Sequence, residues 1–218
     1  MGTITRSFAN NLTTGGVLKA GAFNDASLNN VTALNAAIAT GSMILLSSQT
    51  ASDSASISFT TGIDSTYKEY QFWFIDIHAR ASGESFLFNM STDSGSNYNV
   101  TKTSTNFRAF HNEADTSTNL SYSTGSDLAQ STDFQQLINS IGSAGDESGS
   151  GYMSLFNPSS TTYVKHFISD TNSYNQGGDY SYRSFNAGYG NTTSAVNAIR
   201  FQMSSGNFDG TILLYGIK

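Results

Sequence analysis

Three histidines stand close to carboxylates, a pairing that metal binding and general-base catalysis both use. His78 follows Asp76 by two residues, His111 precedes Glu113 and Asp115, and His166 is the third. A metal site needs several such ligands to converge, and the chain has neither the H-x-H nor the H-E-x-x-H spacing that places two ligands on one element. We therefore predict no metal site and interpret the histidines as ordinary strand residues.

Hydrolysis of a glycan would require two carboxyl groups on either side of the bond, about 5 to 9.5 Å apart. The chain has 16 acidic residues, so some pair meets this separation by chance. Asp146 and Glu147 are adjacent in a Gly/Ser-rich stretch, which indicates a solvated loop tip. The G-x-S-x-G turn of serine hydrolases is absent. We expect no catalytic residues, and a glycan-degrading enzyme is the third of three alternatives.

The segment 170–179, DTNSYNQGGD, carries the oxygen-bearing side chains that bind Ca²⁺. It lacks the EF-hand spacing and the terminal Glu, so we interpret it as an Asn/Asp/Gly turn. We expect no cofactor.

Five aromatic residues lie in or beside this turn and are the candidate contact residues: Tyr174, Tyr180, Tyr182, Phe185 and Tyr189. In strands, such residues belong to a core or a subunit interface. Exposed, they would form a stacking platform for sugars or a contact patch for a neighbouring protein. We place the interface ahead of the glycan platform.

Charge and hydropathy exclude several partners. The net charge is −6 and the 10 basic residues are scattered singly, so no basic surface for nucleic acid or anionic lipid is predicted. No run approaches the ~20 apolar residues of a membrane span, so we expect no membrane insertion. The start MGTITR lacks the apolar region of a secretory signal. We expect synthesis in the cytoplasm and, if the protein ends outside a cell, a route other than secretion, such as release inside a particle.

The surface is predicted to be polar but nearly uncharged. Only 12% of the residues are charged, while 15 Phe and 11 Tyr provide enough apolar area to fold. Ser, Thr, Asn and Gly take the place of the missing charges, a composition that suits extracellular or particle-bound proteins.

Residues 1–40 are predicted to form an extended N-terminal arm. Val31, Leu34 and Ile38 have the i, i+3, i+7 spacing of one or two helical turns, which Gly41 would end. The other apolar residues follow no period and cannot bury a core, so we expect them to anchor the chain to a neighbouring protein. These anchoring residues are Ile4, Phe8, Leu12, Val17, Leu18 and Phe23.

Residues 41–218 are predicted to form one β domain. Residues 98–101 would pair with residues 85–91 across a Gly-containing turn, and residues 134–141 suit a strand or a helix. About ten to twelve short strands separated by turn signals indicate an all-β fold. We predict an antiparallel β-sandwich of jelly-roll type, with a closed barrel as the alternative.

The segment 69–77 is predicted to be a central strand covered on both sides. Its apolar residues occupy both faces, Tyr70, Phe72 and Phe74 on one and Trp73, Ile75 and Ile77 on the other.

Five segments stand out together: TGIDSTYKEY (61–70), STDSGSNYNV (91–100), LFNPSSTTYVKHF (155–167), NTTSAVNAI (191–199) and FQMSSGNFDGTILLYG (201–216). They resemble segments of a family of virion proteins in tailed bacteriophages of marine bacteria, whose members are described as structural or tail-fibre-like. The resemblance spans residues 41–218. It implies a place in the phage particle and a role at its surface, and it assigns no functional residue.

The sequence thus predicts a non-enzymatic virion structural protein that is displayed on the particle and anchored by its arm. We expect a homotrimer that contacts other virion proteins of the capsid or tail. Capsid decoration is placed ahead of a tail fibre or adhesin for a host-surface glycan or protein, because the long repetitive shaft of fibres is absent.

Overall fold

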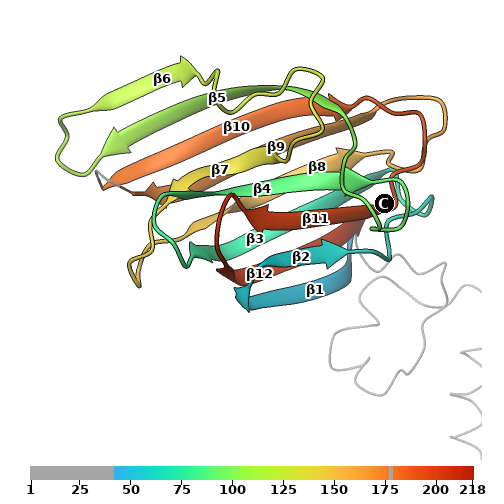
Figure 1. The fold of residues 1–218 in the computed structure, drawn as a ribbon, viewed down its shortest axis with the longest axis horizontal. Helices are drawn as coiled ribbons and strands as arrows, with labels where there is room; N and C mark the ends of the chain where they lie inside the picture. The colour runs from blue at the N-terminus through green and yellow to red at the C-terminus, as the bar shows by residue number, and fades with distance from the viewer. Residues whose placement is uncertain (1–41, 177–178) are drawn as a thin grey trace, which may run out of the picture. The chain divides into compact units, whose positions relative to one another are not determined.

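The computed structural model describes residues 42–176 and 179–218, which form strands and loops (Figure 1). The predicted arm, its anchoring residues and its short helix lie outside these residues. No helix long and apolar enough to cross a membrane occurs in the described parts of the chain. The strands are β1 (Met43–Ser54), β2 (Ser56–Phe59), β3 (Glu69–Ala79), β4 (Glu84–Ser91), β5 (Lys102–Asn112), β6 (Thr118–Tyr122), β7 (Gln135–Ile141), β8 (Gly149–Phe156), β9 (Lys165–Asn175), β10 (Tyr180–Gly190), β11 (Ala198–Met203) and β12 (Phe208–Ile217).

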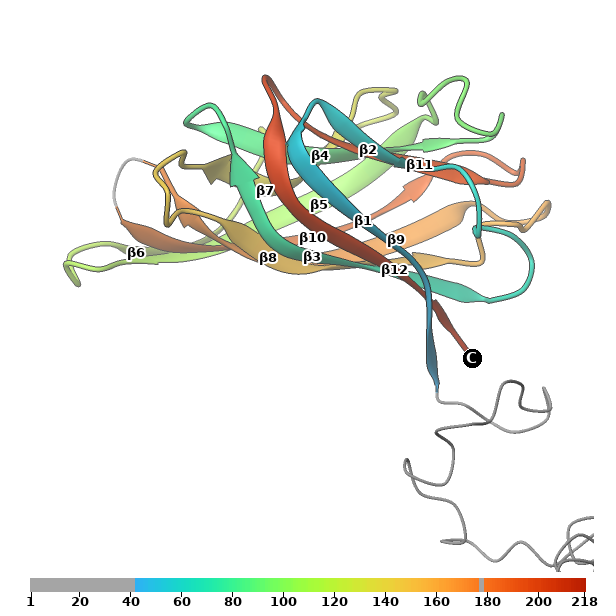
Figure 2. The ribbon, with the colours of Figure 1, turned by 90° about the horizontal axis from the view of Figure 1, so that it is seen from below.

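All strand pairs are antiparallel. One run follows the order β1-β12-β3-β8-β9-β10-β5-β6, and a second follows β7-β4-β11-β2. The runs meet where Ile141 of β7 pairs with Asn175 of β9. At the other side, the Gln49 side chain of β1 donates a hydrogen bond to the Ser58 carbonyl of β2 (3.0 Å). The sheet therefore nearly closes into a barrel, and β10, β5 and β6 continue past the junction (Figures 1 and 2).

The predicted all-β antiparallel fold is confirmed, and the finer prediction of a jelly-roll sandwich is not. Residues 134–141, which suited a strand or a helix, form β7. Residues 98–101 were wrongly predicted as a strand. The side-chain amide of Asn89 donates to the Tyr98 carbonyl (2.8 Å). The Asn89 side chain therefore binds the Tyr98 carbonyl, which would bind a backbone N–H if this segment were a paired strand.

A cluster of phenylalanine rings fills one end of the interior. Phe201 of β11 lies at its centre and is fully buried. Its ring centroid lies 5.2 to 6.4 Å from those of Phe59, Phe72, Phe74, Phe86 and Phe88. These rings come from four strands of both runs, so their contacts hold the two runs against each other.

Strand β3 is covered on one face only, so its predicted cover on both faces was wrong. Phe72 and Phe74 are buried, whereas Trp73 and Ile75 are 41% and 39% exposed. The pairing with β8 slips between Phe74 and Ile77, where Asp76 has a φ of 51°. This bulge adds one residue and turns Ile77 into the core. The change of face accounts for the buried Ile77, whereas Trp73 and Ile75 precede the bulge and remain on the outer face.

The interior beneath β9, β10 and β5 is polar. Asn186 of β10 donates through its amide to Ser169 Oγ (3.1 Å) and is also bonded to the amide of Asn106. Ser104 Oγ donates to Gln135 Oε1 of β7 (2.5 Å). All five side chains are buried, and pairing satisfies their polar groups. This network leaves the opposite face of the same strands free to meet solvent.

Candidate binding groove

Alternation along β9 and β10 divides the five predicted contact aromatics between two faces. Tyr180 and Tyr182 pack against Phe110 on the inner face, where the Tyr182 ring stacks on it with 6.1 Å between centroids; Tyr180, at the start of β10, also lines the polar hollow described below. Arg108 donates to the Tyr182 hydroxyl (3.1 Å). Tyr182 is only 6% exposed. It is therefore part of the interior.

The other three predicted aromatics lie on the outer face. Phe185 and Tyr189 are an odd number of residues from Tyr182, so they point the opposite way. Tyr174 of β9 pairs with Ser181, which also points outward. These three residues do not touch one another. They lie along the two strands, with other exposed residues between them.

One lateral row of the outer face carries five aromatic side chains, which we call the aromatic row. Residues opposite each other in antiparallel strands share a face, and neighbouring strands are ~4.8 Å apart. Four of the five rings are more than a third exposed. From β3 to β6, each opposite the next, the row comprises Trp73, Tyr152, Asp170, Phe185, Phe107 and Tyr122.

Sequence reasoning missed Trp73, Tyr152, Phe107 and Tyr122 because they belong to strands far apart in the chain. In β3, Trp73 lies between the buried Phe72 and Phe74, so its outward direction could have been inferred; β6, which holds Tyr122, has no buried residue and gives no such signal. The membership of the aromatic row is determined by which strands pair and by the register of each pair. Neither is readable from one sequence.

Four hollows follow one another on the outer face of β9, β10 and β5, and we call them together the outer groove. The apolar end hollow lies between His166 and Tyr189, and the next lies at Phe107 and Phe185. Ala187 lines both and is the small floor between these aromatic pairs. From Tyr189 to Ser181 the strand advances eight residues, or ~27 Å.

An ion pair lies in the middle of the outer groove. Arg183 donates from Nε to Asp170 Oδ1 (2.8 Å) and from a terminal nitrogen to Oδ2 (2.5 Å). Its guanidinium carbon lies 4.5 Å from the centroid of the Phe185 ring. The bond to Asp170 raises the pKa of Arg183, so the guanidinium keeps its charge. It presents a planar polar group beside aromatic rings.

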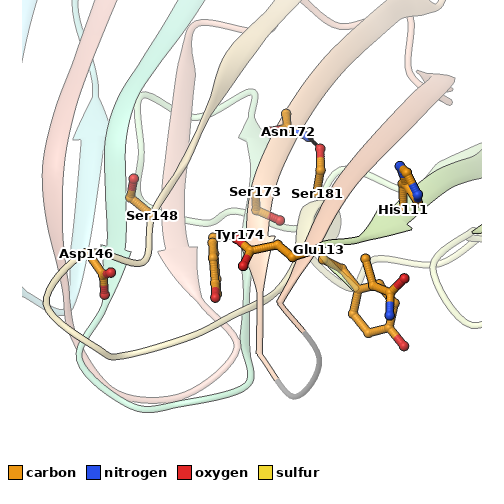
Figure 3. A pocket seen from close by; sticks show the side chains of 10 residues that line it. His111, Glu113, Asp146, Ser148, Asn172, Ser173, Tyr174 and Ser181 are labelled. Carbon is orange, nitrogen blue, oxygen red and sulfur yellow. Dashed lines mark hydrogen bonds between the residues drawn. The ribbon is translucent and has the colours of Figure 1, made fainter. Parts of the chain in front are cut away.

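The far end of the outer groove is a polar, acidic hollow of about 520 Å³ (Figure 3). Tyr174 stands between Asp146 and Glu113 in this view, with Ser148 close by. The Tyr174 hydroxyl donates to Asp179 (2.6 Å), which raises the pKa of Tyr174 to about 12. Burial and the nearby charges, including that of Glu113, act in the same direction. The phenol therefore remains a neutral donor.

The histidines are dispersed. His111 lines the polar hollow and contacts Asp115 (2.9 Å), while His166 lies at the apolar end of the groove. His78 Nδ1 lies 2.6 Å from the Glu147 carbonyl. Within residues 42–176 and 179–218, no three His, Asp or Glu residues are placed to hold a metal ion. In the segment 170–179, which carries oxygen-bearing side chains of the kind that bind Ca²⁺, the first carboxylate, that of Asp170, is bonded to Arg183.

Comparisons of the chain with protein-family models, with curated proteins and with solved structures found no match.

Proposed function

We propose that this chain is a non-enzymatic protein of a phage particle surface that acts by binding, with the outer groove as its recognition site. The observation that carries the proposal is the aromatic row crossing a line of hollows. Exposed aromatic side chains at this density mark binding surfaces rather than ordinary solvated faces. The virion location rests on the sequence resemblance.

The groove favours a receptor-binding role, as in a tail fibre or adhesin, over capsid decoration. It is long and hollowed, and it combines apolar and polar groups, which suits an extended ligand. Capsid decoration, contact with other virion proteins and the homotrimer stay predictions. Microscopy of purified particles and the molar mass in solution would check them.

The proposal predicts that the labelled full-length chain binds cells of at least one strain in a panel of marine bacteria. The double variant Phe107→Ser/Tyr152→Ser should weaken this binding at least ~10-fold, because central aromatic contacts contribute more than ~1.4 kcal/mol. Flow cytometry measures the binding. Tyr163→Ser is the matched control, since Tyr163 is 69% exposed and lies outside the groove.

Two results would contradict this function. Equal binding by the double variant and the wild type would exclude the groove as the site. Release of sugar from cell-surface polysaccharide by the wild type, but not by Glu113→Gln, would show an enzyme instead.

A further inference from the structure

We propose that the outer groove binds a linear glycan that carries no acidic groups, laid along β9 and β10. This inference rests on the proposed function and names the ligand of the same site.

The first argument is the shape of the site. The hollows extend over ~27 Å of strand, far more than one sugar ring spans. The polar hollow shares Asn172 and Ser181 with the neighbouring hollow, and the two apolar hollows share Ile168 and Ala187. The two pairs of hollows share no lining residue and adjoin at the bonded side chains of Asp170 and Arg183, one from each pair. A succession of adjoining subsites of this kind suits a chain of similar units.

The second argument is the mixture of chemical groups. A sugar ring presents C–H bonds on its faces and hydroxyls around its edge, so it needs aromatic surface and hydrogen-bonding groups side by side. Phe185 and Tyr152 supply the aromatic surface at the centre. The ion pair of Arg183 with Asp170 supplies donors and acceptors in the same place.

The same mixture argues against a protein partner or a second copy of the chain. The centre of a protein interface is depleted of Asp, Glu and Lys, although Arg is enriched there. In the outer groove the centre holds the Arg183–Asp170 pair, with side chains 53% and 21% exposed. Covering this pair with an apolar partner would remove its remaining hydration without replacing it.

The third argument is charge. Glu113 and Asp146 line the polar hollow, and neither forms an ion pair within the described residues. The Arg183 cation is already neutralised by Asp170. A uronate, sulfate or phosphate on the ligand would therefore meet carboxylates without a compensating cation, and like charges at an interface oppose binding. A glycan without acidic groups avoids this repulsion.

The chain provides its own reporter for the test. Trp73 is the only tryptophan, it is 41% exposed, and its ring centroid lies 6.2 Å from that of Tyr152 in the aromatic row. Ligand that covers the centre of the row should change the fluorescence of Trp73. Binding is thus measured next to the proposed site, through the neighbour of Tyr152.

The experiment uses polysaccharide extracted from the cells that bind the full-length chain, divided by anion exchange into neutral and acidic fractions, and protein extracted from the same cells. We expect the neutral fraction to shift the Trp73 fluorescence and to compete with cell binding. Phe107→Ser/Tyr152→Ser should weaken binding of this fraction at least ~10-fold. Tyr163→Ser should match the wild type.

Competition by the acidic or the protein fraction, without competition by the neutral one, would overturn the glycan inference while cell binding upholds the proposed function. If no cells bind, the proposed function itself fails. The remaining possibility is that the groove is an interface between copies of the chain. Light scattering of the wild type and of Phe107→Ser/Tyr152→Ser tests it. A wild-type oligomer that Phe107→Ser/Tyr152→Ser converts to monomers would make the groove an interface between copies and would overturn the inference.

Discussion

Replacing Phe201 with alanine is expected to lower the free energy of unfolding by about 3 to 5 kcal/mol. The ring is fully buried and contacts five other phenylalanine rings from both runs of the sheet. Its removal leaves a cavity that strands of fixed register cannot collapse to fill. Guanidinium unfolding followed by circular dichroism measures the loss.

The matched control is Phe107→Ala, which removes the same side chain from the outer face, where it is 45% exposed. It should lower the stability far less. Phe201→Leu keeps most of the buried volume and should fall between the two, which provides a folded variant if the alanine protein is too unstable. Equal losses for Phe201→Ala and Phe107→Ala would contradict the central position of Phe201.

Stability should rise by about 3 kcal/mol between pH 7 and pH 9.5 because of Lys102. This side chain is fully buried, and its ammonium donates to Asn89 Oδ1 (2.6 Å) and to the Val100 carbonyl (2.8 Å). Burial lowers the pKa of Lys102 to about 7 from an ordinary value near 10.5, and the charge of Asp133 only partly opposes this.

The sign follows from the protons bound in each state. Between pH 7 and 10.5 the unfolded chain retains more of the proton on Lys102 than the folded chain, which is about half deprotonated at pH 7 and loses the rest as the pH rises. The unfolded state is favoured at pH 7 because it binds more protons, and raising the pH removes this preference. The free energy of unfolding therefore rises. Urea unfolding at several pH values measures the slope.

Lys102→Met should remove most of this slope, whatever its effect on stability at pH 7. Burial also lowers the pKa of Lys165, which accounts for a smaller slope that remains. Lys68→Met removes an exposed lysine and should leave the slope unchanged. A stability that stays flat from pH 7 to pH 9.5 in the wild type would contradict the lowered pKa.

The strands could be predicted from sequence where alternation was undisturbed. In β11, Phe201 and Met203 alternate with Arg200 and Gln202, and the structure buries the first pair. In β3, a bulge at Asp76 turns Ile77 into the core, and the apolar Trp73 and Ile75 before it are exposed although their residue types indicate burial. A bulge moves every later side chain to the other face without changing the composition.

The outer groove could be predicted only in part. Tyr174, Phe185 and Tyr189 were identified because they are close in the chain, but Tyr182 was identified for the same reason and lies inside. The sequence suggested that its many Ser, Thr and Asn residues form the surface. Asn106 and its partners show that part of this composition builds a hydrogen-bonded interior, which depends on contacts between distant strands.

Each position of the aromatic row comes from a different strand, and its side chain lies on the outer face, away from the phenylalanine cluster. A substitution there, such as one at Tyr152 or Tyr122, alters one contact point and leaves the interior packing intact. If the chain is the phage surface protein proposed above and its row meets a bacterial surface, substitutions there would adjust the host range one position at a time. Sequence differences between related chains should then concentrate at these outward positions, while the phenylalanine cluster stays constant.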